Sequence, residues 1–220
     1  LSAEAALQEM GSASDGLSAG EATRRLEQYG ANELREKAHR TKWQILLDQF
    51  KGILTVLLIV AALVSAFLGD WIEAVAILII VVLNGVLGYT QESRAEQSME
   101  ALKRMSVPIV RVRRDGQLRE ISARDLVPGD IVILETGNIV PADGRVLSSV
   151  NLRVEEAALT GESEAVDKES DLIFEDDRAL GDRRNMLYSG TIVNYGRGEF
   201  IVTGTGMETE LGHIATMLQS

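Results

Sequence analysis

Two long apolar stretches lie close together in the first half of the chain. Residues 52–69 and residues 74–91 contain no charged side chain, and only Asp70-Trp71-Ile72-Glu73 separates them. As a helix, each stretch would measure about 27 Å, close to the roughly 30 Å hydrocarbon core of a bilayer. The pattern predicts an antiparallel pair of membrane helices. A buried helical pair in a soluble protein is the alternative, and charge-free runs of this length disfavour it.

The helical pattern continues past the second apolar stretch. Residues 91–105 are rich in helix formers, and Pro108 ends the pattern. One helix from Ile72 to Met105 would therefore stand roughly 20 Å above the bilayer as a stalk. Within it, we expect Asn84 to hydrogen-bond to another helix, and Gly85 and Gly88 to permit close approach. An ion-ligand role for Asn84 is disfavoured, because one amide without nearby carboxylates cannot replace a cation's hydration shell.

From Ile109 onward apolar and polar residues alternate, which indicates β-strands. Asp115-Gly116 is a favoured hairpin turn after the first of them. Further turns are expected at Gly137-Asn138 and at Tyr195-Gly196-Arg197-Gly198. The expected strands are residues 109–114, 117–121, 130–135, 144–150, 152–156, 186–193 and 198–202. The pattern becomes helical again at Gly206.

Before the apolar stretches, residues 17–22 form a helix start. Ser18 is placed to cap the helix, Glu21 to reach back to the cap amide, and Gly30 to end it. We expect a small amphipathic helix that packs on a neighbouring element. The chain is thus divided into five expected parts: a helical segment (1–39), a first membrane helix with its approach (40–71), a second membrane helix with its stalk (72–106), a β-rich domain (107–205) and a linker helix (206–220).

Composition and charge narrow the possible functions. The net charge is −11, and the acidic excess lies mainly in residues 92–220, which argues against nucleic acid as a partner. The chain has no cysteine, so disulfides and thiolate metal sites are excluded. No basic, apolar and small-residue leader is visible in it. Basic residues flank the outer ends of the apolar pair and its turn is acidic, so both ends are expected in the cytoplasm, with the lipid bilayer as a partner.

The chemically most informative segment is Thr160-Gly161-Glu162-Ser163, which follows the strand expected at residues 152–156. An ordinary surface loop with a solvated carboxylate is the alternative for an isolated Gly-Glu pair. The order of apolar hairpin, polar stalk, Gly-rich β segment and this loop nevertheless resembles the beginning of a P-type cation-transporting ATPase. Other segments resemble signatures of the same family in the same order: Gly16-Leu17-Ser18, residues 29–34, 126–130, 141–144 and 185–191.

The resemblance implies a fold and a role for the loop. The fold is a membrane α-helical hairpin with a cytoplasmic β-rich actuator domain, a distorted barrel similar to a jelly roll, and short flanking helices. In this family the loop glutamate, here Glu162, prepares water to attack a phosphorylated aspartate. A carboxylate is ionised at neutral pH and can accept the water's proton. Gly161 leaves room for the backbone to approach phosphate, and Thr160 and Ser163 supply hydroxyls for loop geometry or the water network.

The resemblance also implies what surrounds these residues in a complete pump. ATP and Mg²⁺ would be its cofactors, and the partners would be a phosphorylation domain, a nucleotide-binding domain, later membrane helices and the transported cation. The 220 residues contain no Asp-Lys-Thr-Gly-Thr motif, so alone they are expected to be inactive and to hold no cofactor. No metal site is expected either, because His39 and His213 are isolated and the acidic run from Glu164 to Asp177 has no calcium-loop spacing.

The transported ion is less closely specified than the family. The segment from Asn185 to Thr191 is most similar to the bacterial and sarcoplasmic-reticulum calcium pumps. Sodium, potassium or proton transport is the first alternative, because calcium pumps of this kind often carry a gating acid inside the first helix, whereas here Asp48 lies outside the apolar stretch. The alternative from another class is a membrane-anchored β-domain that only binds or regulates, which leaves the loop at Thr160 unexplained.

Overall fold

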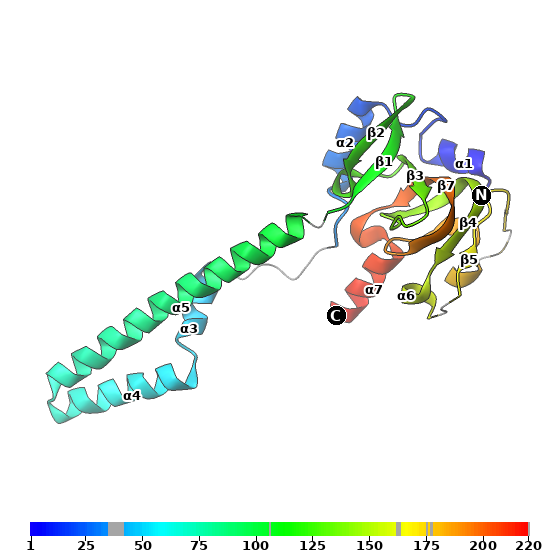
Figure 1. The fold of residues 1–220 in the computed structure, drawn as a ribbon. Coiled ribbons are helices and arrows are strands. Elements are labelled where there is room, and N and C mark those ends of the chain that lie inside the picture. Colours follow the sequence, from blue (N-terminus) through cyan, green and yellow to red (C-terminus); the bar gives the residue numbers. More distant parts are fainter. Residues whose placement is uncertain (35–41, 106, 162–163, 175, 177, 220) are drawn as a thin grey trace. The chain divides into compact units, whose positions relative to one another are not determined.

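The computed structural model of the chain describes residues 1–34, 42–105, 107–161, 164–174, 176 and 178–219. Its backbone forms two compact units (Figure 1). One consists of residues 36–106 and is helical. The other combines residues 1–35 with residues 107–220 and contains all the β-strands described.

The helical unit is a hairpin. α3 (Lys42–Gln49) and α4 (Ile53–Leu68) meet at a bend of 67°, and α5 (Trp71–Met105) runs back beside α4. α5 has the length expected for a membrane helix that continues into a stalk.

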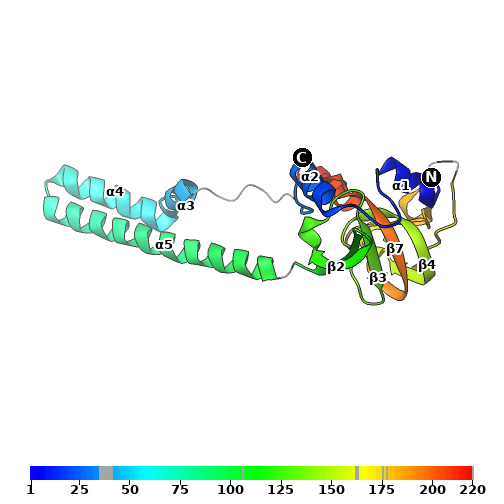
Figure 2. The ribbon, with the colours of Figure 1, turned by 90° about the horizontal axis from the view of Figure 1, so that it is seen from above.

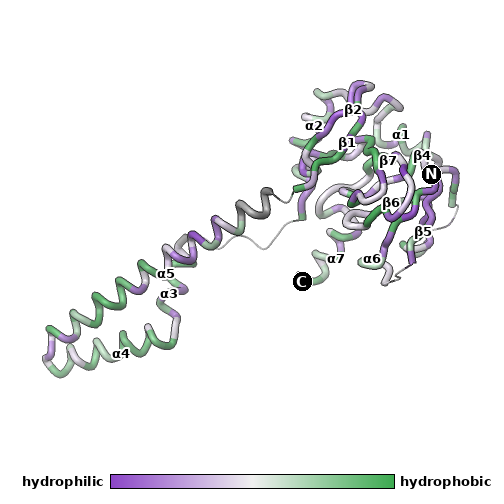
Figure 3. The backbone as a smooth tube through the Cα atoms, in the orientation of Figure 1, coloured by the Kyte–Doolittle hydropathy of each residue, from purple (hydrophilic) through white to green (hydrophobic). Residues whose placement is uncertain are grey.

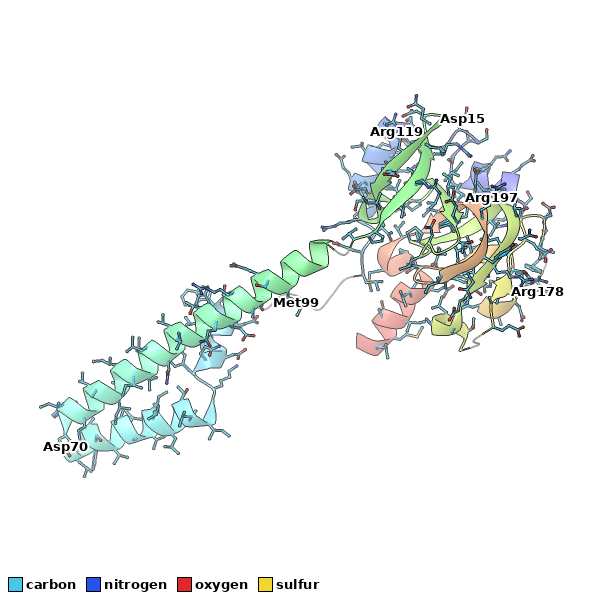
Figure 4. All side chains as sticks on the ribbon, in the orientation of Figure 1. Asp15, Asp70, Met99, Arg119, Arg178 and Arg197 are labelled. Atoms are coloured by element: carbon cyan, nitrogen blue, oxygen red, sulfur yellow. The ribbon has the colours of Figure 1, made fainter. Side chains whose placement is uncertain are left out.

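A glycine cap makes the tight turn between α4 and α5. Gly69 ends α4 in the left-handed conformation, with φ 93°. The Gly69 amide donates to the carbonyl of Ala66, and the Asp70 amide to that of Ser65. These bonds satisfy carbonyls at the end of α4 while the chain reverses direction. The acidic side chain of Asp70 lies at this turn (Figure 4).

The two glycines of α5 allow close contact within the helical unit, as their positions predicted. A Cβ on Gly85 would lie 3.0 Å from the ring of Phe50, and one on Gly88 would lie 2.2 Å from Gln49 Oε1. Asn84 lies on an exposed side of α5, and the helix expected to receive its amide stays a prediction.

α4 and the part of α5 beside it consist mainly of hydrophobic residues (Figure 3). Residues Trp71–Met99 of α5 are long and apolar enough to cross a membrane, and the bent pair of α3 and α4 passes the same criterion if it is one span. The large side chains exposed on α4 and α5 include Ile53, Leu57, Leu63, Phe67, Ile72, Leu83 and Leu87.

The second unit is built on an antiparallel seven-stranded sheet. The strand order is β2-β1-β3-β7-β4-β5, and β6 also pairs with β4. Figure 2 shows β3, β7 and β4 side by side. The strands are β1 (Ile109–Arg114), β2 (Gln117–Ser122), β3 (Ile131–Glu135), β4 (Asp143–Glu155), β5 (Val166–Asp167), β6 (Met186–Leu187) and β7 (Ile192–Gly204). This β-rich architecture is the one expected from the alternating pattern.

Two long strands replace several short ones that the sequence predicted. β4 joins the strands expected at residues 144–150 and 152–156, and β7 runs through the turn expected at Tyr195-Gly196-Arg197-Gly198. The β4–β7 pairing shifts register several times along its length. A Cβ on Gly196 would lie 2.2 Å from Asn151 O, and one on Gly198 would lie 2.7 Å from Ser148 O. These glycines therefore serve irregular strand pairing rather than a chain reversal.

The β-rich unit has one main apolar core. Its inward side chains come from β1, β3, β4, β6 and β7 and from the loops beside them. Buried members include Val112, Leu126, Val132, Leu134, Val146, Leu152, Val154, Leu187, Phe200 and Val202.

The N-terminal helices α1 (Ala3–Glu9) and α2 (Ala19–Tyr29) belong to the same unit. Leu17 and Ala22 pack against Val127 in a small buried cluster. Ser18 caps α2 as expected, because its hydroxyl accepts from the Glu21 amide. The Glu21 carboxylate accepts hydrogen bonds from Arg24 and Arg25, which lower its pKa to about 2.

Asn32 joins three separate segments of this unit. Its side-chain amide donates to the carbonyls of Ala123 and Pro141, at 3.0 and 2.9 Å. Its Oδ1 accepts from the Gly206 amide at 2.8 Å. The residues after α2 are thereby tied to the start of the C-terminal helical region.

We expect Asn32→Asp to destabilise the β-rich unit by about 2–3 kcal/mol, because the carboxylate cannot donate to two carbonyls that it would face. Thermal and denaturant unfolding of the detergent-solubilised chain, followed by far-ultraviolet circular dichroism, measures this. Glu33→Gln is the matched control, because the Glu33–Arg124 ion pair is about half exposed on both sides and should contribute little. A loss for Asn32→Asp no larger than that for Glu33→Gln would contradict the role given to Asn32.

Asp143 holds the C-terminal helix α7 (Glu210–Gln219) against the sheet. One carboxylate oxygen accepts from the Ser189 amide and the other from the Glu210 amide, each at 2.7 Å. The second bond satisfies an amide in the first turn of α7. Burial raises the pKa of Asp143, although both hydrogen bonds favour its ionised form.

Candidate active site

The segment that contains the Thr-Gly-Glu-Ser sequence begins as a short helical turn after β4. This turn, α6 (Ala157–Thr160), lies at the end of β4 (Figure 1). The carbonyl of Glu156 accepts from the amides of Leu159 and Thr160, and the carbonyl of Ala157 accepts from the Gly161 amide. The backbone as far as Gly161 is thus anchored to the end of a sheet strand.

Gly161 ends α6 in a left-handed conformation, with φ 77° and ψ 0°. A Cβ at this position would meet no described atom within 4 Å, so space inside the unit does not require glycine here. The backbone conformation does favour it, because a side chain in the left-handed region costs about 1–2 kcal/mol. Gly161 is exposed, so the turn faces outward from the domain.

Thr160 makes contacts at the start of the tetrapeptide, and its assignment to loop geometry or to the water network stays a prediction. Its hydroxyl donates to the Glu156 carbonyl at 3.1 Å, and its methyl group lies near Gly181 of the short 3-10 helix η2 (Leu180–Asp182). Glu162 and Ser163 lie outside the described residues, so their catalytic assignments stay predictions. In the sequence, Glu162 directly follows Gly161, which is exposed and left-handed.

Two strands close the base of this loop. β4 leads into it and β5 leads out, and Arg153 and Val154 pair with Asp167 and Val166. Arg153 Nε lies 2.7 Å from Asp167 Oδ1 across this ladder, with both side chains about half exposed.

A second ion pair lies beneath the loop and is fully buried. Lys168 Nζ is 2.6 Å from Glu156 Oε1, and both side chains are 0% exposed. Neither carboxylate oxygen has a well-aligned hydrogen bond among the described residues, so the contact is chiefly one of opposite charges. The ammonium also donates to the Arg183 carbonyl at 3.4 Å and lies 5.6 Å from the centre of the Tyr188 ring.

Burial governs the protonation of this pair. It raises the pKa of Glu156, with the Lys168 ammonium opposing the shift. It lowers the pKa of Lys168, with the Glu156 carboxylate opposing that shift. Burial likewise raises the pKa of Tyr188 far above its usual range.

This pair was not among the candidate residues predicted from the sequence, although the strand pattern contained a signal. Leu152, Val154 and Glu156 share one strand parity, and the first two are core residues. Val166 and Lys168 share a parity on the other side of the loop. A charged residue that continues an inward-facing row predicts a buried partner of opposite charge.

The other polar candidates behave as surface groups where they are described. Within the acidic run, residues 164, 167, 169, 171 and 176 are exposed. His213 is about half exposed and lies 3.8 Å from Glu210, whereas His39 lies outside the described residues. No group of three metal-binding side chains occurs among the described residues.

Comparison with known proteins places these features in a family context. A family model described as the P-type ATPase actuator domain matches residues 104–219, and one described as the N-terminus of cation transporters and ATPases matches residues 1–65. A calcium-transporting ATPase of Listeria monocytogenes is 47% identical over 205 residues, 93% of this chain and 23% of the relative.

Other relatives share the same region under different names. A calcium-transporting ATPase of Lactococcus lactis is 46% identical over 97% of this chain, and a sodium/potassium exporting P-type ATPase of Schizosaccharomyces pombe is 42% identical over 93% of it. The chain spans 24% and 20% of the lengths of these two relatives, so it corresponds to about a quarter or less of each.

Proposed function

The chain belongs to the P-type ATPase family, and we propose that it forms the N-terminal part of a calcium-transporting member in which the loop at residues 160–163 promotes hydrolysis of an aspartyl-phosphate. The observation that carries this proposal is the anchored, outward-facing turn that ends at Gly161, directly before Glu162, within a region matched by the actuator-domain model. The proposal requires the carboxylate that follows this turn in the sequence to reach a group outside its own domain.

The proposed chemistry needs one water and one base. The oxygen of a water attacks phosphorus, and the bond between phosphorus and the aspartyl oxygen breaks with its electron pair on the aspartate. The carboxylate of Glu162 takes the water's proton, so the products are the free aspartate and inorganic phosphate. Thr160 holds the loop geometry through its bond to the Glu156 carbonyl, and Ser163 is assigned to the surrounding hydrogen-bond network.

Calcium is proposed as the cargo because two of the relatives described above are named for calcium transport at 46–47% identity. ATP and Mg²⁺ are proposed cofactors of the complete pump, and none of the residues of this chain is assigned to them. The complete protein in everted membrane vesicles should accumulate ⁴⁵Ca²⁺ when ATP is added, and a calcium ionophore should release it. Uptake of ²²Na⁺ in place of calcium would instead support the first alternative, a pump for sodium, potassium or protons. If ATP drives the uptake of neither ion, the result would favour the binding or regulatory module.

Gly161→Ala should slow phosphoenzyme decay in the complete pump by about tenfold. The alanine is strained at φ 77°, and the backbone relieves the strain by moving the residue that follows, which is Glu162. Gly137→Ala is a matched control, because Gly137 has φ 89°, a Cβ there would also meet nothing within 4 Å, and it lies in the turn after β3. Equal decay rates in the two variants would show that strain alone, and not the loop, determines the effect.

We propose that the regions at residues 40–71 and 72–106 contain two membrane helices, with residues 1–39, 107–205 and 206–220 in the cytoplasm. The apolar outer surface of α4 and α5 and the acidic turn between them support this arrangement.

Single cysteines are easily scored in a chain that has none. In intact cells, an impermeant thiol reagent should label Trp71→Cys and leave Gln117→Cys unlabelled until the membrane is opened. Labelling of Gln117→Cys with protection of Trp71→Cys would invert the topology.

A further inference from the structure

The buried Glu156–Lys168 pair occupies the two chain segments that flank the candidate loop. Glu156 is the residue before α6, and Lys168 is the residue after β5. Their charged groups meet at 2.6 Å, with both side chains inaccessible to solvent. The pair therefore links the chain segment that leads into the loop to the segment that leads out of it.

Each partner is also fixed to the domain by backbone contacts. The Lys168 amide donates to the Leu152 carbonyl at 2.8 Å, and its ammonium reaches the Arg183 carbonyl beside η2. The Glu156 carbonyl accepts from two amides of α6 and from the Thr160 hydroxyl. A displacement of Glu156 would therefore be passed to α6 and to Gly161.

Stability is a weak reason for such a pair. Removing two charges from water is costly, and a buried ion pair can often be replaced by uncharged side chains of similar volume without loss of stability. A buried ion pair instead restricts conformation, because few other arrangements of the same two chain segments bring both charges together.

We propose that Glu156 and Lys168 are positioning residues that set the direction in which the chain leaves Gly161, and thereby aim Glu162 at the aspartyl-phosphate. This inference rests on the proposed function of the loop. The two residues do not touch the reacting atoms. They act through α6, because the Glu156 carbonyl accepts hydrogen bonds from the amides of Leu159 and Thr160.

The chain supplies a matched control for this proposal. Arg153 and Asp167 form an ion pair across the same two strands at 2.7 Å, but both side chains are about half exposed. A pair in water holds its partners weakly. Asp167→Asn thus removes a charge contact at the base of the loop without disturbing the buried anchor.

The test compares phosphoenzyme decay in variants of the complete pump. The near-isosteric, uncharged double variant Glu156→Gln/Lys168→Met should be phosphorylated from ATP to the wild-type level and should decay about 10- to 100-fold more slowly, as expected for a misplaced base. Asp167→Asn should decay within about twofold of wild type. A double variant that decays as fast as wild type would overturn the proposal.

A combined variant separates positioning from a general structural effect. If the pair acts through Glu162, adding Glu162→Gln to the double variant should give the decay rate of Glu162→Gln alone, because there is no longer a base to aim. Multiplied effects would contradict the proposal. A wild-type rate for Glu162→Gln alone would instead reject the proposed function, so the two failures are distinguishable.

Hydrogen exchange on the chain itself provides a second readout. The amides of Leu159, Thr160 and Gly161 are bonded within α6, so they should exchange faster in the double variant while core amides of β7 stay protected. Unchanged exchange in α6 would contradict the anchoring role. If the double variant does not accumulate as folded protein, Glu156→Asp decides: it keeps the charge but shortens its reach, and decay at the wild-type rate would reject the proposal.

Discussion

Glu162→Gln is expected to trap the complete pump in its phosphorylated state. The amide is nearly the same size as the carboxylate but cannot accept the proton of the attacking water, so phosphorylation should proceed and hydrolysis should slow by about 10²- to 10⁴-fold, the usual contribution of a positioned general base. Steady-state phosphoenzyme should rise toward full occupancy while ion transport falls in proportion to turnover. Acid-quenched labelling with [γ-³²P]ATP and vesicle uptake measure the two quantities.

The effect should be specific to this carboxylate within its acidic surroundings. Glu164 lies two residues further on, is exposed, and carries the same charge. Glu164→Gln should therefore leave both the phosphoenzyme level and transport within about twofold of wild type, because a solvated carboxylate at that position has no assigned contact with the attacking water. Equal phosphoenzyme accumulation in the two variants would indicate a general charge effect of the acidic loop.

Lys168→Met alone is expected to destabilise the β-rich unit by about 3–5 kcal/mol, because it leaves the Glu156 carboxylate buried without its counter-charge. In a domain of this size the loss corresponds to a fall in the unfolding temperature on the order of 10 °C. The double variant Glu156→Gln/Lys168→Met should recover most of this loss, since it removes the unpaired charge as well. Far-ultraviolet circular dichroism of the detergent-solubilised chain measures both variants.

The loss in Lys168→Met should depend on pH. Burial already raises the pKa of Glu156, and the lysine that opposes this shift is absent in the variant. A carboxyl group whose folded pKa lies above its unfolded value favours folding when protonated, so its penalty is full at pH values above the folded pKa. The penalty declines as the pH falls toward the unfolded value of about 4.3. A deficit relative to the double variant that is constant between pH 8 and pH 5 would contradict this explanation.

The sequence predicted features that depend on local patterns. Alternation located β1, β2 and β3 within one residue, and Asp115-Gly116 forms the expected hairpin turn, with φ of 52° and 71°. Gly85 and Gly88 lie at the close contacts within the helical unit that their positions indicated. The family resemblance, confirmed by the matches at residues 104–219 and 1–65, rested on motifs in order rather than on any single segment.

Features that depend on contacts between residues far apart in the sequence were harder to predict. Gly196 and Gly198 were interpreted as part of a turn, but glycine favours both chain reversal and irregular strand pairing, and only the approach of Ser148 and Asn151 decides between them. The bond from the Gly206 amide to Asn32 joins residues 174 positions apart, so no local pattern indicates it. That the N-terminal segment belongs to the β-rich unit is therefore visible only in the structure.

Only part of the candidate site was predicted, because the rest depends on a contact between two separate chain segments. Thr160 and Gly161 were identified from the tetrapeptide, and the structure adds the left-handed cap and the bond to the Glu156 carbonyl. The buried support beneath them was missed because Glu156 and Lys168 lie twelve residues apart on either side of a loop. Each resembles an ordinary surface charge until the inward parity of its strand is considered.

The decay rate of the phosphoenzyme shows whether Glu162 acts as a catalytic base or belongs to an ordinary turn. The complete pump and its Glu162→Gln variant are labelled with [γ-³²P]ATP, chased with unlabelled ATP, and quenched in acid at successive times. We expect equal initial labelling of the two proteins and decay about 10²- to 10⁴-fold slower in the variant. Equal decay rates in the two proteins would mean that the loop at Thr160–Ser163 is only a turn, and would contradict the catalytic role given to it.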